Sequence, residues 1–328
     1  EHWLPDWCED QPGDPDEHAF VQFMLERQWN RLRRYAAKQG IGFIGDVPIF
    51  VHADSVDVRR RPELFRLDRS GNPTVVTGVP PDGFCKNGQL WGHPHYRWAS
   101  HRKERFAWWV DRFRLAIGRF DAIRVDHFIG FVRLYEVAAN AKTARRGTWR
   151  RTPGRELLET LRRELGPLPL IAEDLGEVTP AVRRLRDDFD LPGMRIVQWA
   201  FFEDNSPELP RNHPRRSVCY PGTHDNDTTR GWYRSLPPDA KVRFRQHAGC
   251  RRVADVAWSM IDLCMDSPAE CCIIPMQDVL NLGSAARMNR PGTPRGNWRW
   301  RMDAHATVSL ARRMRTTTAR RSSMLPRP

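Results

Sequence analysis

Three short apolar runs of this sequence each end on an acidic residue. The runs over residues 122–126, 168–173 and 218–225 end on Asp126, Glu173 and Asp225. This pattern predicts three strands that present carboxylates at their C-terminal ends, where the loops of a parallel α/β sheet converge. Three carboxylates brought together there favour chemistry on glycosidic bonds.

Cleavage of a glycosidic bond needs one ionised carboxylate and one protonated carboxyl group. Arg124 lies two positions before Asp126, so the two side chains share a face of the strand, and a charge pair would favour ionised Asp126. Asp126 therefore suits the nucleophile. Glu173 follows an apolar run and precedes Asp174, so burial and a like charge would both raise its pKa toward an acid/base role. The sequence leaves open which of these two effects is larger.

Tryptophan is abundant, with 13 residues in the chain. Trp91, Trp298 and Trp300 fall in expected loops rather than on helical faces. Sugar rings stack on indole through their apolar C–H faces, so loop tryptophans are typical of a carbohydrate cleft. Packing under a long loop is the alternative for any single tryptophan.

The elements that must position these side chains alternate along most of the chain. A helix is expected over 17–39, and a long irregular stretch over about 53–95 is expected to be functional or an inserted subdomain. Helices are also expected around 106–117, 157–165, 180–189 and 253–264. Strands are expected at 41–51, 122–125, 168–172, 194–200, 217–221 and 271–275. This order predicts a parallel α/β sheet, and the pattern alone allows a doubly wound sheet or a (β/α)₈ barrel.

Composition points to one large domain in the cytoplasm. The 328 residues are 40% hydrophobic and 28% charged, no apolar run approaches the roughly 18–20 residues of a membrane span, and the start does not resemble a signal peptide. The net charge of +13 invites a nucleic-acid interpretation. Only five of the 53 basic residues are lysines and the arginines are scattered, which favours compositional bias. No specific nucleic-acid or membrane partner is predicted.

No metal or cofactor site is predicted. The seven cysteines lack a Cys-x-x-Cys spacing, and Cys271 and Cys272 are expected to pack in the core. His93 and His95 lie in a proline-containing segment without a third ligand nearby. Phosphate-loop, dinucleotide-binding and Gly-x-Ser-x-Gly motifs are absent from the sequence.

Six stretches of the chain together resemble one enzyme family, the 4-alpha-glucanotransferases or amylomaltases of the alpha-amylase clan. The stretches, in family order, are residues 44–51; 78–84 with Gly88-Gln89-Leu90-Trp91-Gly92; Arg124-Val125-Asp126-His127-Phe128; Ala172-Glu173-Asp174-Leu175-Gly176; Gly222-Thr223-His224-Asp225-Asn226-Asp227-Thr228-Thr229; and Gln277-Asp278-Val279-Leu280 through Arg287-Met288-Asn289 to Gly296-Asn297-Trp298-Arg299-Trp300. The resemblance extends over about residues 17–303. It implies a (β/α)₈ barrel.

The resemblance also implies the chemistry. Asp126 would be the nucleophile, Glu173 the general acid/base and Asp225 the transition-state stabiliser. The implied substrate-binding residues are Arg124, His224, Asp46, Asp82, Phe84, Trp91 and Asn297. Such enzymes form a covalent glucosyl intermediate with retention and pass the glucan to the 4-hydroxyl of another sugar. Their substrates are maltooligosaccharides and glucans derived from starch or glycogen, and no cofactor is implied.

Two departures from the family pattern stand out. Gly83 replaces a sugar-stacking tyrosine found in some members, which would weaken an acceptor contact. The family barrel begins with two strands and an inserted subdomain that have no counterpart before Glu17. We therefore expect residues 1–303 to form an incomplete barrel without its first two strands, with an inserted loop region at about 53–95, and residues 304–328 to form a basic tail.

Two other functions remain open from the sequence. A hydrolase of the same clan would convert maltotriose only to shorter sugars. An inactive glucan-binding fragment would bind glucans without turnover.

Overall fold

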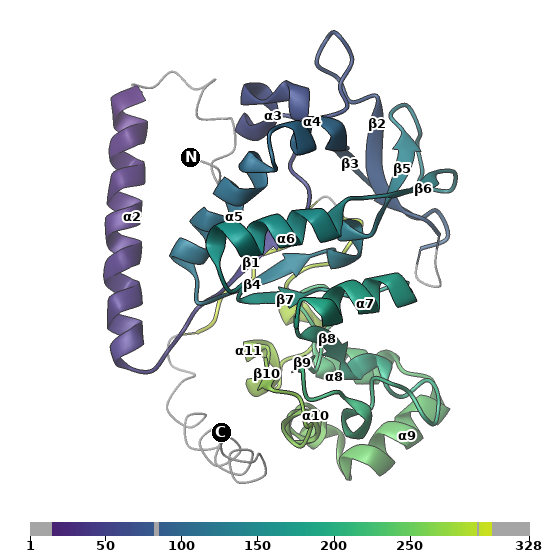
Figure 1. Cartoon of the computed structure of the whole chain (residues 1–328). Coiled ribbons are helices and arrows are strands. Elements are labelled where there is room, and N and C mark those ends of the chain that lie inside the picture. The colour runs from purple at the N-terminus through teal and green to yellow at the C-terminus, as the bar shows by residue number, and fades with distance from the viewer. Residues whose placement is uncertain (1–14, 82–84, 294, 304–328) are drawn as a thin grey trace. The chain divides into compact units, whose positions relative to one another are not determined.

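The computed structural model describes residues 15–81, 85–293 and 295–303. The chain divides into two compact units, residues 1–191 and 192–328, and each is considered by itself (Figure 1). Within the described ranges, no helix combines the length and the hydropathy needed to cross a membrane.

The first described element of unit 1 is a long helix, α2, over Pro15–Lys38, which confirms the helix predicted at 17–39. Asp16 and Glu17 lie in its first turn, where acidic side chains complement the helix dipole. Gly40, with φ of +69°, follows its last turn and allows the chain to reverse. Trp29 anchors the helix, because its ring packs on Phe43 and its indole N–H donates to the carbonyl of Arg119.

Three parallel strands form the sheet of unit 1: β1 (Ile44–Pro48), β4 (Ala122–Asp126) and β7 (Leu170–Ala172). The pairing places Pro48 opposite Asp126, so the carboxyl ends of β1 and β4 are level. β1 and β7 are shorter than the predicted strands, whereas β4 begins at the predicted residue and extends one residue further, to Asp126.

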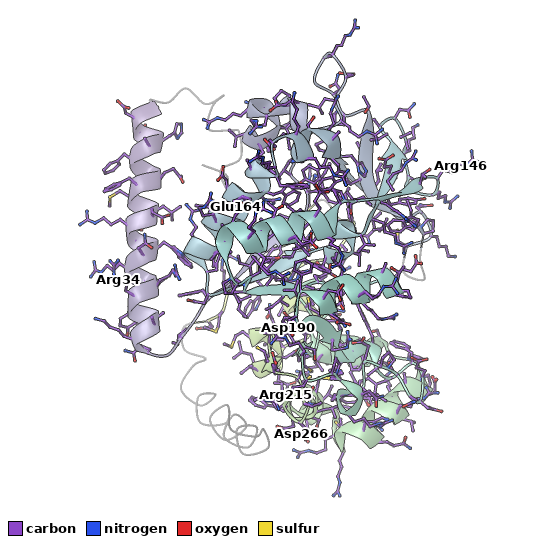
Figure 2. All side chains as sticks on the ribbon, viewed as in Figure 1. Arg34, Arg146, Glu164, Asp190, Arg215 and Asp266 are labelled. Carbon is purple, nitrogen blue, oxygen red and sulfur yellow. The ribbon has the colours of Figure 1, made fainter. Side chains whose placement is uncertain are left out.

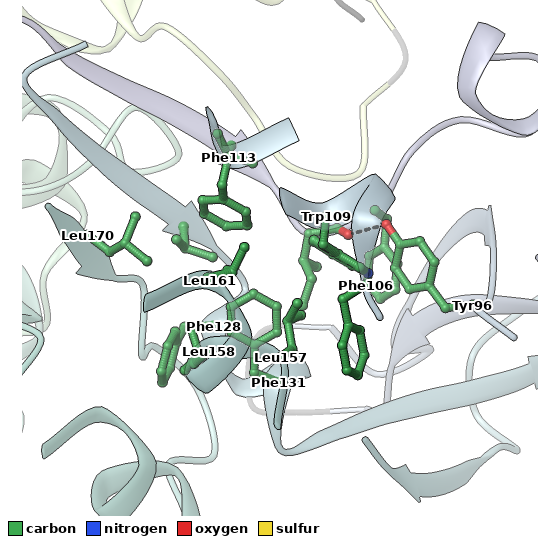
Figure 3. Packing of buried hydrophobic residues seen from close by; sticks show 14 of the residues in the cluster. Tyr96, Phe106, Trp109, Phe113, Phe128, Phe131, Leu157, Leu158, Leu161 and Leu170 are labelled. Atoms are coloured by element: carbon green, nitrogen blue, oxygen red, sulfur yellow. Dashed lines mark hydrogen bonds between the residues drawn. The ribbon is translucent and has the colours of Figure 1, made fainter. Parts of the chain in front are cut away.

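Helices connect and cover the strands of unit 1. α5 (Ala107–Arg119) precedes β4, α6 (Gly154–Leu165) precedes β7, and α7 (Pro180–Asp188) follows β7. α5 and α6 pack side by side. Figure 3 shows the buried side chains between these helices and the strands, including Trp109, Phe113, Leu157, Leu161 and Leu170.

A second sheet in unit 1 is antiparallel, in the order β3-β2-β5-β6. Its strands are β2 (Val75–Val79), β3 (Gln89–Pro94), β5 (Arg133–Ala138) and β6 (Thr148–Arg151). The short helices of this region and its surroundings are α3 (Val56–Arg60), η1 (Pro62–Leu64), α4 (Trp98–Lys103) and η2 (Phe128–Phe131). The prediction of an irregular stretch over 53–95 is therefore wrong at β2 and β3, which pair with each other. β2 also pairs with β5, a strand distant in the sequence.

Unit 2 contains three further parallel strands: β8 (Gly193–Ile196), β9 (Ser217–Tyr220) and β10 (Cys271–Cys272). Its helices are η3 (Val197–Trp199), η4 (Pro210–Asn212), α8 (Thr229–Ser235), α9 (Pro238–Ala248), η5 (Val253–Asp255), α10 (Val256–Met265), α11 (Met276–Val279) and η6 (Ser284–Ala286). The strand predicted at 194–200 is wrong beyond Ile196, because the apolar run continues into the buried 3₁₀ turn η3. The strand predicted at 271–275 is limited to two residues.

One glycine in β1 is fixed by a close approach. A Cβ atom on Gly45 would lie 2.3 Å from the Phe120 ring, so any other residue would displace that ring. Phe120 in turn makes an edge contact with Trp29 of α2. The close packing of Phe120, and through it of Trp29, against β1 therefore depends on glycine at position 45.

Candidate active site

Arg124 connects two carboxylates at the end of the unit 1 sheet. It lies opposite Asp46 in the β1–β4 register, and its Nη1 donates to both Asp46 carboxylate oxygens at 2.8 and 2.7 Å. Its Nη2 donates to Asp126 Oδ1 at 2.8 Å, which confirms that Arg124 and Asp126 share a face. The Asp126 side chain is 44% exposed, whereas that of Arg124 is 12% exposed. A reachable carboxylate thus has a partly buried positive charge beneath it.

Glu173 follows β7 directly and is only 9% exposed. Its Oε2 accepts a hydrogen bond from the backbone N–H of His127 at 2.7 Å. Burial is the main cause that raises the pKa of Glu173 to about 8, and the negative charge of Asp126 adds to it, while Arg124 acts in the opposite direction. The predicted rise in pKa is confirmed, and at neutral pH the carboxyl group holds a proton.

The like charge expected from Asp174 contributes less than that of Asp126. Asp174 is buried, but its carboxylate forms an ion pair with Arg186 at 2.5 Å. That guanidinium provides a counter-charge next to Asp174. The sequence correctly predicted that burial and a like charge raise the pKa of Glu173. The larger like charge, however, is that of Asp126 at the end of β4 and not that of the adjacent Asp174.

His127 joins the two carboxyl groups through the backbone. It follows Asp126 in a left-handed conformation, with φ of +55°, which directs its N–H toward Glu173. Its ring is buried and makes an edge contact with Trp91, with ring centroids 4.8 Å apart. Burial lowers the pKa of His127 to about 4, so the imidazole is neutral. Its Nε2 is buried without a hydrogen-bond partner in the described part of the chain.

Trp91 lies on strand β3, so its predicted place in a loop is wrong. Its ring is half-buried and contacts Phe50 as well as His127. The structure thus brings Trp91 to the neighbourhood of the Asp126 turn by sheet pairing.

Unit 2 presents Asp225 five residues after β9 ends. The side-chain amide of Asn289 donates to Asp225 Oδ1 at 2.6 Å, and Arg287 Nη2 donates to the Asp225 carbonyl at 2.5 Å. His224 Nε2 lies 3.6 Å from Asp225 Oδ1. The segment 287–289 therefore holds the His224–Asp225 turn. Asn289 was not among the predicted site residues, although the sequence stretch that contains it was part of the resemblance.

Two other predicted residues lie in the segment after Asn289. Trp298, with φ of +60°, donates its N–H to the carbonyl of Met288 and lies with its ring 5.2 Å from that of His224. Asn297 bonds within its own loop, because its side chain pairs with Thr293 and with the backbone N–H of Arg290. These hydrogen bonds of Asn297 join it to Arg290 and Thr293 rather than to Asp225 or His224.

A buried carboxylate, Asp278, holds the end of the loop that carries His224 and Asp225. Asp278 of α11 accepts hydrogen bonds from the N–H and the hydroxyl of Thr229, at 2.7 and 2.8 Å. These bonds fix the start of α8, where the loop after Asp225 ends. Burial raises the pKa of Asp278 to about 6.

The remaining predictions have mixed outcomes. Asp82, Phe84 and the basic tail lie outside the described residues. His93 and His95 do not form a metal-binding group among the described residues, since His95 bonds to the carbonyl of Val76 and His93 stacks on Phe50. Three cysteines that are far apart in the sequence, Cys219, Cys264 and Cys272, come together.

The basic side chains spread over both units. Arg34 lies on α2, Arg146 in the connection between β5 and β6, and Arg215 before β9 (Figure 2). The arrangement agrees with the scatter of arginines along the sequence.

A protonated, buried carboxyl beside an exposed, ion-paired carboxylate at the ends of parallel strands is typical of enzymes that act on glycosidic bonds. A sequence model of the family described as 4-alpha-glucanotransferase matches residues 3–307. The chain therefore belongs to the 4-alpha-glucanotransferase family.

Individual relatives agree with this assignment. The chain is 46% identical over 293 residues to a 4-alpha-glucanotransferase of Thermus thermophilus and 45% identical over 287 residues to one of Aquifex aeolicus, each match covering 87% of this chain. It spans 59% of the length of each relative. The solved amylomaltase of Streptococcus agalactiae, in complex with acarbose, superimposes with a TM-score of 0.91 at 36% identity, covering 93% of this chain and 62% of that one. The fold is thus α/β with parallel strands, as in amylomaltase.

Proposed function

We propose that this protein transfers a segment of a 1,4-alpha-glucan to the 4-hydroxyl of an acceptor glucan or glucose. The observation that carries the proposal is the pair of Asp126, exposed and bonded to Arg124, and Glu173, buried and protonated. Membership of the family supports the same reaction. The substrates would be maltooligosaccharides and glucans derived from starch or glycogen.

The first step forms a bond between a carboxylate oxygen of Asp126 and the anomeric carbon. The glycosidic C–O bond breaks, and Glu173 gives its proton to the leaving oxygen, which departs as the 4-hydroxyl of the released chain. Arg124 holds the attacking carboxylate through its Nη2, while Asp46 fixes the guanidinium from the other side.

The second step reverses the roles. Glu173, now a carboxylate, takes the proton of an acceptor 4-hydroxyl as its oxygen attacks the anomeric carbon, and Asp126 leaves. Two displacements on one carbon retain its configuration. If water attacked instead of a sugar, the outcome would be hydrolysis.

Further residues belong to the proposal by resemblance. Asp225 would stabilise the positive charge of the transition state, with His224 beside it, and their support by Asn289 and Arg287 suits that role. Trp91, Asp46, Asn297, Asp82 and Phe84 would contact the glucan. The proposal also places the described parallel strands in a (β/α)₈ barrel within residues 1–303, with 304–328 as a tail, and the protein in the cytoplasm.

A maltotriose assay tests the function. Disproportionation predicts glucose together with maltooligosaccharides longer than maltotriose, and Asp126→Ala is expected to abolish both products. Shorter sugars alone would establish the hydrolase. Binding of maltooligosaccharides without turnover, unchanged in Asp126→Ala, would establish an inactive glucan-binding protein and overturn the proposal.

A further inference from the structure

Three cysteine side chains of unit 2 meet on adjoining elements. Cys219 lies on β9, Cys272 on β10 and Cys264 on α10. Their sulfur atoms all lie within 4.8 Å of one another. Cys219 and Cys272 are direct partners in the β9–β10 register, so the sheet pairing itself holds these two residues adjacent.

The surroundings of the three cysteines are apolar. Cys219 and Cys264 are fully buried in the hydrophobic cluster of unit 2, and Cys272 packs against that cluster from a half-buried position. Burial, and then the thiols of Cys219 and Cys272, raise the pKa of Cys264. The hydrogen bond with Cys264 lowers the pKa of Cys219, but the hydrogen bond with Cys272 and burial together outweigh it, so this pKa is also raised. Thiols in such an environment are neutral until a cation replaces their protons.

The spacing suits a metal held by sulfur. A metal–sulfur distance of about 2.3 Å in a trigonal arrangement requires sulfur atoms about 4 Å apart. The three sulfur atoms would therefore have to move closer to one another by less than about 1 Å. The alternative explanation is that the three cysteines meet only because they pack as small apolar side chains. Such packing does not require the sulfur atoms to lie at a distance that suits a metal.

The ligand set selects the class of metal. Three sulfur atoms in an apolar environment favour a soft cation, whereas Mg²⁺ and Ca²⁺ need oxygen ligands. Structural zinc sites have four ligands, and among the described residues no fourth Cys, His, Asp or Glu joins the group. We propose that Cys219, Cys264 and Cys272 form a three-thiolate site for a soft monovalent cation of the Cu(I) type.

Binding would add a link between α10 and two strands, β9 and β10, that already pair in the sheet. The metal would join β9, β10 and α10, and each thiol that becomes a ligand would release its proton to solvent. Because the site would exist only in the folded chain, the metal is expected to raise the unfolding temperature. This inference is independent of the proposed glucan transfer.

The test uses the full chain, reduced and free of oxygen, titrated with the acetonitrile complex of Cu(I). We expect one equivalent of metal to produce a thiolate-to-copper charge-transfer absorption in the ultraviolet, with an increase in Tm. Loss of a second-shell partner costs about 10–100-fold in metal affinity, so Cys272→Ala, which removes a ligand, should weaken binding by at least about 100-fold. Cys219→Ala should behave in the same way.

Matched controls separate the site from general thiol binding. Cys271→Ala changes the residue next to Cys272, and Cys250→Ala changes another buried cysteine of unit 2, yet neither residue belongs to the cluster. Both controls should keep the absorption band and the Tm increase. Circular dichroism checks that each variant folds, and the half-buried Cys272 is the substitution most easily accommodated. An unaltered titration of folded Cys272→Ala, or no one-equivalent band in the unsubstituted chain, would overturn the proposal.

Discussion

The carboxyl groups of Asp126 and Glu173 differ in protonation because of their surroundings, although they are chemically alike. Glu173 is buried and receives backbone hydrogen bonds, whereas Asp126 is open to solvent and bonded to a guanidinium. The raised pKa of Glu173 depends on burial first and on the Asp126 charge second. A substitution that removes the Asp126 charge but leaves Glu173 buried therefore separates the two contributions to this pKa.

Asp126→Asn is expected to lower the pKa of Glu173, because it removes the like charge and leaves Arg124 with one acidic partner fewer. Burial remains, so the pKa should stay above the ordinary value of 4.5. A carbon-13 NMR titration of the Glu173 carboxyl measures the change. Asp174→Asn should have a smaller effect, and an identical pKa in Asp126→Asn and the unsubstituted chain would contradict this explanation.

Glu173→Gln should reduce glucan transfer by about 10²–10⁴-fold, the usual contribution of general acid/base catalysis. In the proposed mechanism the first step needs the protonated acid, so the rate of the unsubstituted chain should fall as the pH rises through about 8. The pH profile of kcat/KM on maltotriose provides the measurement. Glu177→Gln, at an exposed carboxylate paired with Arg133, serves as the control and should leave the profile in place.

At the scale of elements, the loop that carries His224 and Asp225 depends on α11. Asp278 closes this link through two hydrogen bonds to Thr229, at the first residue of α8. Its folded pKa of about 6 exceeds the ordinary 3.8, so the folded chain binds the proton more tightly than the unfolded chain. The associated stability is present at low pH and is lost as the pH rises through about 6.

Asp278→Asn should keep both hydrogen bonds, since the amide can accept from the Thr229 N–H and donate to its hydroxyl oxygen, and it should remove the cost of a buried charge. Asp278→Ala leaves the Thr229 groups unsatisfied and should lower the free energy of unfolding by about 1–3 kcal/mol. Denaturant titrations at pH 5 and pH 7 measure both. The gain of Asp278→Asn over the unsubstituted chain should grow from pH 5 to pH 7.

The exposed Asp266→Asn provides the matched control in unit 2, because it removes an acidic charge away from the Thr229 contact. A smaller advantage of Asp278→Asn at pH 7 than at pH 5 would show that the sign of the pKa shift is wrong.

Elements with a local signal could be predicted from the sequence. The helix expected around 180–189 is α7, which Thr179 caps by accepting a hydrogen bond from Val182, and β4 ends at Asp126 as its apolar run indicated. The antiparallel sheet could not be predicted, because β2 and β5 stabilise each other across a long sequence separation. The contact between Asn289 and Asp225 was missed for the same reason, since it joins residues 64 positions apart.

For the whole molecule, the contacts divide the chain into two compact units. The incomplete barrel expected over residues 1–303 stays a prediction. Each unit contains its own buried cluster, around Trp109 and Phe113 in unit 1 and around Phe201 and Phe244 in unit 2. Sequence periodicity identifies the helices and strands of both units. It cannot show where long-range contacts become sparse, because that depends on packing.

The charge of +13 should not produce tight nucleic-acid binding, because the arginines are spread over both units (Figure 2). We expect duplex DNA to bind no more tightly than about 10⁻⁴–10⁻⁶ M at physiological salt, without sequence preference. Fluorescence anisotropy with two unrelated duplexes at low and physiological salt measures this. Salt-resistant binding, or a preference for one duplex, would contradict it.

The close approach at Gly45 has an evolutionary consequence. Because the Phe120 ring occupies the space of a side chain at position 45, neither residue can change freely without the other. Homologues with alanine or serine at position 45 should carry a smaller residue at position 120, so the two positions should covary. Paired substitutions at positions 45 and 120 would then show, from sequences alone, that Phe120 packs against β1 throughout the family.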